Sequence, residues 1–254
     1  MQIIHKVILF FLLSLSPHLH STQIHALIAA DTITNIKHSS KHDLNNMRQI
    51  LDTISVAIGA PLHTHELTAK KLALEPLEKW LRGVHSTPDD IVFFYFTGHG
   101  LRSKKSATMW PALYFVHSGK LIDMNAIVEK VKKVPARLYV IISDCCNNMR
   151  KKARIFFPKD LLPEQPAPDA PRAAYRKLFL ETQGIIIASG AVPGELAWAS
   201  DQGGIFTNAL LESLRHEVSN ESEPHWHHIF ERSGSLCNSL QKPQYLIHIT
   251  SVQK

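Results

Sequence analysis

Two apolar runs, each followed by a chemically reactive side chain, most constrain what this chain can fold into. The first run, residues 91–96, leads to His99, and the second, residues 138–142, leads to Cys145 and Cys146. Short runs rich in β-branched and aromatic residues are typical of the buried strands of a parallel sheet. Functional groups in such sheets collect at the carboxyl ends of the strands. We therefore expect a histidine and a cysteine at the same edge of one sheet.

Strand-like and helix-like patterns alternate along the rest of the chain. Strands are predicted at 24–30, 62–67, 91–97, 138–143, 184–189 and 245–249, with a hairpin or a further strand at 110–117. Helices are predicted at 42–58, 76–83, 123–131 and 207–214. This alternation predicts an α/β sandwich with a largely parallel central sheet and helices on both faces.

The composition is that of a globular protein and excludes little beyond nucleic-acid binding. Hydrophobic residues make up 44% and charged residues 20% of the 254 residues, so a sizeable core is available. The net charge is +6, but no Lys/Arg block is longer than three residues, so nucleic acid is not an expected partner. We expect a single domain over residues 22–254. An exposed internal loop is expected at about 151–180, because five prolines lie between 157 and 172.

The amino terminus has the pattern of a secretory signal. Lys6 precedes an apolar run at residues 7–15, and Ser21 suits a cleavage site, so residues 1–21 are predicted to be a signal peptide. The run is too short to span a bilayer comfortably. We therefore expect an exported protein, periplasmic or secreted, with no stable membrane span after cleavage. The alternative is that the run is a buried strand or helix of the domain.

The cysteines and histidines indicate neither a disulfide framework nor a metal site. Three cysteines are too few to stabilise a chain of this length by disulfide bonds: Cys145, Cys146 and Cys237. They are either kept for chemistry or buried as small apolar side chains. The clusters at 225–228 and 63–65 lack a cysteine or carboxylate at a zinc-binding spacing, so no metal is predicted. A redox role for the adjacent cysteines would lack the usual CxxC site.

A thiol and an imidazole at one sheet edge can carry out nucleophilic catalysis. The imidazole activates the thiol and then hands a proton to the leaving amine. The backbone N–H groups of Gly100 and Cys146 could form an oxyanion hole, worth roughly 3–4 kcal/mol per donor. The gap between His99 and Cys146 is 47 residues (146 − 99), near the roughly 50 residues of the caspase pattern.

Four segments together resemble the metacaspases and bacterial caspase-like peptidases (peptidase family C14, clan CD). Residues 95–100 resemble the histidine motif of that family, and residues 143–146 resemble its Asp-Xaa-Cys motif. Residues 42–51 are similar to its first helix, and 203–210 to the Gly-Xaa-Phe-Thr segment that opens a late helix. The resemblance runs in order over most of the chain. It implies a caspase-like three-layer sandwich.

The resemblance also implies roles for individual residues. Cys146 occupies the position of the nucleophile and His99 that of the base, whereas Cys145 has no implied role. Asp43 and Asp144 match the two aspartates of the primary specificity (S1) pocket, although Asp43 could simply cap a helix. Two carboxylates in a pocket favour a substrate cation. The implied activity is that of a cysteine endopeptidase acting on proteins or peptides after Arg or Lys.

One departure from the family pattern keeps a second function open. Asn147-Asn148-Met149 stands where metacaspases usually have His-Ser-Gly after the cysteine. The alternative is therefore a catalytically inactive homologue that acts as an interaction or scaffold domain. No cofactor is predicted, and because many metacaspases use calcium, activation by calcium stays open even though no loop has a Ca²⁺-ligand pattern. The sequence does not predict an oligomeric state.

Overall fold

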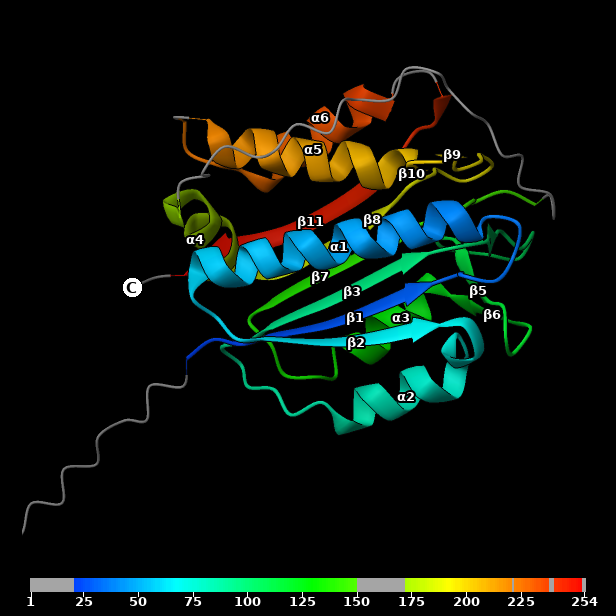
Figure 1. Cartoon of the computed structure of the whole chain (residues 1–254), viewed down its shortest axis with the longest axis horizontal. Coiled ribbons are helices and arrows are strands. Elements are labelled where there is room, and N and C mark those ends of the chain that lie inside the picture. The colour runs from blue at the N-terminus through cyan, green and yellow to red at the C-terminus, as the bar shows by residue number, and fades with distance from the viewer. Residues whose placement is uncertain (1–20, 150–171, 221, 238–239, 253–254) are drawn as a thin grey trace, which may run out of the picture.

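A six-stranded sheet forms the centre of the computed structural model, which describes residues 21–149, 172–220, 222–237 and 240–252 (Figure 1). The strands are β1 (Ile24–Ala30), β2 (Leu62–Thr68), β3 (Ile91–Thr97), β7 (Leu138–Asp144), β8 (Thr182–Ser189) and β11 (Gln244–Ser251). Their order is β11-β8-β7-β3-β1-β2, and every neighbouring pair is parallel except β11 with β8. The predicted largely parallel sheet is confirmed.

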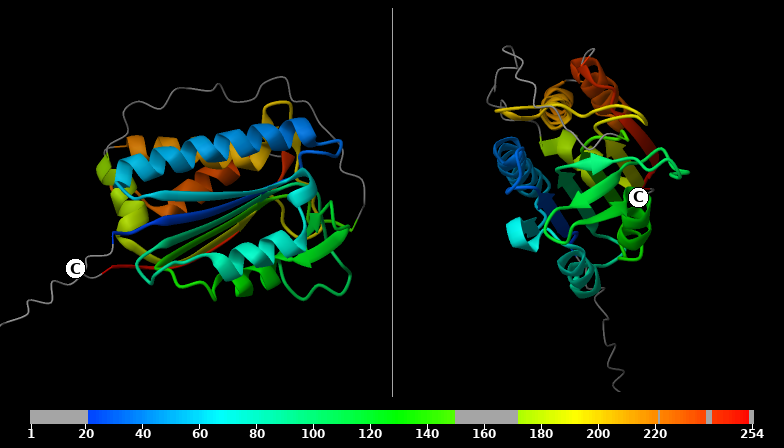
Figure 2. Two further views of the ribbon diagram at one scale, coloured as in Figure 1. Left: turned by 60° about the horizontal axis from the view of Figure 1, so that its bottom comes forward. Right: turned by 90° about the vertical axis from the view of Figure 1, so that its right-hand side faces the viewer.

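Helices cover both faces of this sheet (Figure 2). One face carries α1 (Lys37–Ile58), α4 (Arg172–Leu180), α5 (Ile205–Ser219) and α6 (Trp226–Cys237), and the other carries α2 (Leu74–Gly83) and α3 (Met124–Val131). Side chains of β3 point alternately into two hydrophobic cores, one on each face of the sheet. Phe93 and Tyr95 belong to the first core, and Phe94 and Phe96 belong to the second. This is the predicted three-layer α/β sandwich.

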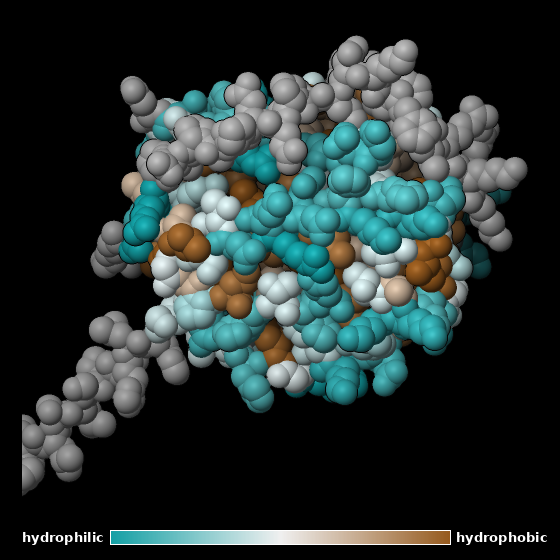
Figure 3. All heavy atoms as spheres, viewed as in Figure 1, coloured by the Kyte–Doolittle hydropathy of each residue, from teal (hydrophilic) through white to brown (hydrophobic). Residues whose placement is uncertain are grey.

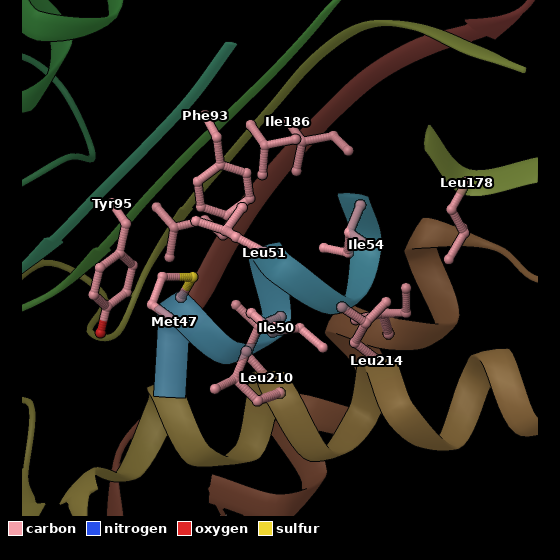
Figure 4. Close-up of a cluster of buried hydrophobic side chains, with 14 of the residues drawn as sticks. Met47, Ile50, Leu51, Ile54, Phe93, Tyr95, Leu178, Ile186, Leu210 and Leu214 are labelled. Atoms are coloured by element: carbon pink, nitrogen blue, oxygen red, sulfur yellow. The ribbon is translucent and has the colours of Figure 1, made fainter. Parts of the chain in front are cut away.

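Helix α1 shows why its sequence forms an amphipathic helix. Met47, Ile50, Leu51 and Ile54 recur at spacings of three and four, and they pack between the sheet and α5 (Figure 4). The surface above this helix is mostly hydrophilic (Figure 3). Gly59 ends the helix in the left-handed conformation, with φ of 71°.

Smaller elements surround the sheet edge at which β3 and β7 end. A three-stranded sheet contains β4 (Gly100–Leu101), β5 (Ala112–Phe115) and β6 (Lys120–Asp123). A short ribbon joins β9 (Ala199–Ser200) to β10 (Gly203–Gly204), and the 3-10 turn η1 spans Ala69–Lys71. The strand expected within 110–117 is β5.

Two sequence-based expectations are corrected by the helices. Helix α1 begins at Lys37 rather than at 42, so Asp43 lies inside the helix and is not its cap. The start was missed because residues 37–41 are polar and carry no apolar periodicity. The predicted loop at 151–180 is wrong for Arg172–Leu180, which form α4 once the prolines end.

Two other expectations fall on residues outside those described. The predicted signal peptide lies at 1–21 and the rest of the Pro-rich loop at 151–171, so neither is described beyond residue 21 itself. Within the described ranges, no helix is long and apolar enough to cross a bilayer.

Candidate functional site

The ends of β3 and β7 bring the predicted histidine and cysteine to one place. The two strands are parallel neighbours, with Thr97 opposite Asp144, and the Gly98 N–H donates to the Asp144 carbonyl at 3.3 Å. One cleft at this edge is lined by all four predicted side chains: Asp43, His99, Asp144 and Cys146. The start of α1 and the segment Ala197–Ala199 complete its walls.

Cys146 lies at the cleft with its thiol turned toward the far wall. The side chain is 6% exposed, and Sγ donates to the carbonyl oxygen of Ala197 at 3.5 Å. Burial raises the pKa of this thiol, so it is protonated at neutral pH in this arrangement. Cys145 also borders the cleft but packs in the second core, where burial raises the pKa of its thiol well above the usual value.

Gly100 fits closely behind the two cysteines. It belongs to β4, is buried, and pairs with Leu113. A Cβ atom at this position would collide with the Cys146 carbonyl and with the side chain of Cys145. Only glycine therefore allows the backbone after His99 to lie this close to the backbone at Cys146.

His99 is held by an asparagine that the sequence did not single out. Its Nε2 lies 3.0 Å from Oδ1 of Asn35, in the connection between β1 and α1. A carboxamide oxygen only accepts hydrogen bonds, so this contact puts the proton on Nε2 and leaves Nδ1 unprotonated. Burial lowers the pKa of His99, and the charge of Asp31 opposes that shift. The imidazole is thus a neutral base at neutral pH.

Asp31 shapes the turn that carries Asn35. Its side chain is fully buried and accepts hydrogen bonds from the Thr34 backbone N–H at 3.1 Å and the Thr34 hydroxyl at 2.7 Å. Its own N–H donates to the carbonyl of Thr97 at 2.9 Å, which ties the turn to the end of β3. The carboxylate therefore fixes the position of Asn35 relative to His99.

The two predicted pocket carboxyls are the most firmly held groups of the cleft. Asp43 accepts from the Thr97 hydroxyl at 2.6 Å and from the Gly204 N–H at 2.7 Å. Asp144 accepts from the N–H and hydroxyl of Thr207 at 2.9 and 2.7 Å. They are only 1% and 5% exposed. Burial, followed by the charge of Asp144, raises the pKa of Asp43, and burial raises that of Asp144.

Glycines surround these carboxyls because no side chain fits there. A Cβ atom at Gly190 would lie 2.6 Å from Oδ1 of Asp144, and one at Gly204 would collide with the Asp144 carboxyl. Gly203 has a φ of 117°, which side chains rarely adopt. The pair Gly203-Gly204 was part of a recognised motif, whereas no sequence signal marked Gly190.

Asn147, part of the departure from the family pattern, joins three loops behind Cys146. Its side-chain nitrogen donates to the carbonyls of Met109 and Ala191 at 2.8 and 3.1 Å. Its backbone N–H donates to the backbone carbonyl of Glu195 at 3.0 Å, and its own carbonyl accepts from the backbone N–H of Gly194 at 2.8 Å. The residue is fully buried. With the contact from Arg102 Nη1 to Oδ1 of Asn147 at 3.4 Å, five hydrogen bonds thus fix the loop after Cys146 although its sequence departs from the family pattern.

Ser40 adds an uncommitted hydroxyl to the cleft. It lies one helical turn before Asp43 on α1 and is 1% exposed, and its Oγ has no hydrogen-bond partner among the described residues. A buried hydroxyl without a partner is costly. It is therefore available to a bound substrate.

No metal centre accompanies this cleft in the part of the chain that the structure describes. Nowhere in those residues do three or more His, Cys, Asp or Glu side chains converge on a point that could hold a metal ion. The groups that the cleft offers are a thiol, an imidazole and two carboxyls. Such groups are able to carry out acyl transfer to sulfur and to pair with a cation.

Known proteins match this chain in fold and in family. Residues 26–250 match the model of the caspase domain that defines peptidase family C14, so the chain belongs to the caspase-domain family. Caspase-1 from Spodoptera frugiperda superposes with a TM-score of 0.54 at 16% identity, over 89% of this chain and 87% of that one. A protein from Geobacter sulfurreducens superposes with a TM-score of 0.56 at 13% identity, over 88% and 92%. At these identities the likeness is one of fold.

A curated relative supports a peptidase class. A probable protease from a Desulfuromonadales bacterium is 25% identical over 154 residues, which is 56% of this chain. The match spans only 18% of that relative's length. The family and this relative together indicate a cysteine-peptidase type of domain.

Proposed function

We propose that this protein is a cysteine endopeptidase that uses a Cys146/His99 dyad and cleaves after Arg or Lys. The observation that carries the proposal is the convergence of a thiol, a neutral imidazole and two buried carboxyls on one cleft. Protein or peptide chains are the substrates that this chemistry serves.

The reaction begins when the Cys146 thiol leaves the Ala197 carbonyl and gives its proton to His99. Sγ attacks the substrate carbonyl carbon and forms a tetrahedral oxyanion, toward which we assign the N–H groups of Gly100 and Cys146. His99 then protonates the leaving amine as the C–N bond breaks, and a thioester remains. Water, deprotonated by His99, attacks the thioester and releases the acid and the thiol.

Specificity for a cationic side chain follows from the two buried carboxyls. Burial and mutual repulsion disfavour their ionised forms in the free protein. A substrate guanidinium or ammonium group supplies the missing countercharge, and Arg can do so through bidentate hydrogen bonds. The free hydroxyl of Ser40 offers a further acceptor on the same wall.

A peptide series tests the proposal directly. Fluorogenic peptides that differ only in the residue before the cleaved bond, Arg, Lys or Asp, would be assayed with and without calcium, because calcium activation is an open part of this proposal. Cleavage after Arg and Lys but not Asp is the expected result. Cleavage only after Asp would refute the specificity and keep the peptidase.

A catalytically inactive interaction domain is the second candidate. The specific observation in its favour is the protonated Cys146 thiol bonded to the Ala197 carbonyl. A chloromethylketone peptide ending in Arg separates the two candidates. Labelling of Cys146 that requires His99 supports the peptidase, whereas no labelling under any condition supports the interaction domain.

We also propose that the protein is exported, on the evidence of the signal-like residues 1–21. The test is fractionation of cells that express the full chain beside a chain with Val7 and Leu9 replaced by aspartate. Removal of about twenty residues and an extracytoplasmic location are expected for the first chain only. An unprocessed cytoplasmic protein in both cases would refute export.

A further inference from the structure

A second, larger cleft lies away from the candidate active site, between α2 and the amino-terminal parts of β1 and β2. Its volume is about 880 Å³, which lies within the range of sites that bind small molecules. Figure 1 places α2 beside β2, which is the edge strand of the sheet. Its walls carry Gln23, His25, His63, His65, Lys71, Glu75, Pro76, Lys79, Trp80, Gly83, Val84 and His85.

The strand wall of this cleft is rigidly built. The rings of His25 and His63, from neighbouring strands, stack with centroids 5.3 Å apart and an interplanar angle of 17°. His63 Nε2 lies 2.7 Å from the Gln23 side-chain oxygen, and His25 Nε2 lies 3.4 Å from the buried carboxylate of Asp90. The two imidazoles are thus fixed before any ligand arrives.

The opposite wall supplies positive charge and apolar surface. Lys71 and Lys79 have no carboxylate within ion-pair distance among the described residues, and Glu75 is the lone acidic side chain lining this cleft there. Trp80 and Pro76, from the same helix face, add apolar surface between them. Cations without partners beside an indole ring suit an anion that also carries a planar apolar part.

We propose that this cleft binds a phosphate-bearing anion of about nucleotide size. Lysine ammonium groups hold phosphate as point charges, and an imidazole that takes up a proton adds positive charge and a second N–H donor. The volume accommodates a phosphate chain together with a ring, and Trp80 offers a surface on which a ring can stack. A metal ion does not fit the same residues, since no three His, Cys, Asp or Glu side chains converge among the described residues.

Acidification strengthens this binding. The charged and titratable groups around the cleft come from four elements. They are His25 and Asp90 beside β1, His63, His65 and Glu66 on β2, Lys71 on η1, and Glu75, Lys79 and His85 on and after α2. Imidazole gains its charge between about pH 8 and pH 5, so the cleft becomes more positive across that range. Burial and Lys71 lower the pKa of His65, against the opposing charge of Glu66, and burial lowers the pKa of His25.

Calorimetric titration of the intact protein tests the proposal. ATP, tripolyphosphate and adenosine would be titrated at about pH 6 and about pH 8, in moderate salt to suppress non-specific binding. We expect saturable binding of ATP and tripolyphosphate that is about tenfold tighter at the lower pH, ATP binding more tightly because of its ring, and no binding of adenosine alone. The Lys71→Ala/Lys79→Ala double variant should bind at least about tenfold more weakly.

The control is Lys132→Ala, an exposed lysine at the end of α3 on the same side of the sheet. It should bind ATP as the unaltered protein does. Equal weakening in this control would show non-specific charge attraction and refute the site, as would an absence of saturable binding or unchanged binding by the double variant. Tight binding of a polyglutamate peptide with no binding of either phosphate compound would refute the phosphate assignment. Because none of these readouts uses peptidase activity, they stand apart from the proposed function.

Discussion

The carboxyl pair and the catalytic pair share one cleft but are held in different ways. Asp43 and Asp144 each accept two hydrogen bonds of 2.6 to 2.9 Å from groups on strands and helices. His99 has a 3.0 Å contact with Asn35, and Cys146 a long 3.5 Å contact with the Ala197 carbonyl. Asp43 and Asp144 are part of a helix and a strand, whereas His99 and Cys146 lie on loops that follow strands.

This difference divides the tasks of the cleft. In the peptidase that we propose, the carboxyl pair is a preorganised site that recognises a cation before chemistry begins. In the same proposal the Cys146 thiol turns before it reaches a substrate carbonyl, so binding in the pocket precedes alignment of the nucleophile. Variants of each pair should therefore separate recognition from chemistry.

The largest effect is expected from removal of the nucleophile. Cys146→Ala should lower kcat/KM for an Arg peptide by at least about 10³-fold, because no covalent intermediate can form. The matched control is its neighbour, since Cys145→Ala should retain activity within about threefold and lose about 1 kcal/mol of stability from its buried position. Equal losses of activity in the two variants would contradict the assignment of Cys146.

Recognition should fail next when one carboxyl is neutralised. Asp144→Asn keeps an acceptor for Thr207 but removes the countercharge, so kcat/KM for Arg and Lys peptides should fall by about 10²-fold. The fold should persist, because the free protein already disfavours the ionised carboxyl. The matched control is Asp52→Asn on the exposed side of α1, which should change nothing. Unaltered preference for Arg in Asp144→Asn would contradict the pocket.

The regular parts of this cleft could be predicted from sequence because burial leaves a periodic pattern. Strands β3 and β7 are continuous apolar runs, buried on both faces, and their ends place His99 and Cys146 correctly. The carboxyls of Asp43 and Asp144 were predicted through motifs of a family, since nothing in their spacing links residues so far apart in the chain.

The loops could not be predicted because their contacts are long-range and polar. Asn35 touches His99 across 64 positions, and Asn147 reaches Met109 and Ala191 across 38 and 44. Such hydrogen bonds follow no period, so the sequence does not reveal that Asn147 fastens the loops after Cys146. Helix α6, with its histidine-rich start, was likewise missed because its few apolar residues make a short pattern.

A smaller effect is expected from the residue that positions the base. Asn35→Ala should lower kcat by about tenfold with KM unchanged, since the imidazole loses the contact that fixes its tautomer. Asn35→Asp should restore part of kcat and move its acid limb to higher pH, because a carboxylate favours the imidazolium. The control is Asn45→Ala, whose exposed side chain accepts a hydrogen bond from Arg48. A change in KM alone would contradict the positioning role.

The smallest effect is expected in the pH dependence of kcat and KM, which should differ between the carboxyl pair and His99. Burial lowers the pKa of His99, so kcat should hold until the pH falls below about 6.5, the ordinary value for histidine. Burial raises the pKa of Asp43 and Asp144, so as the pH falls these carboxyls take up protons early and lose the charge that binds the substrate. KM for an Arg peptide should therefore rise by about threefold to tenfold before kcat declines.

Steady-state kinetics from about pH 8 to about pH 5 measure the pH dependence of kcat and of KM on the same enzyme. In Asp144→Asn the rise of KM at low pH should become smaller, while the fall of kcat should stay at the same pH, since only the carboxyl pair has been changed. A shared limb for kcat and KM, present in both proteins, would mean that one group governs recognition and chemistry together. The division between a preformed pocket and a catalytic pair aligned by substrate would then be wrong.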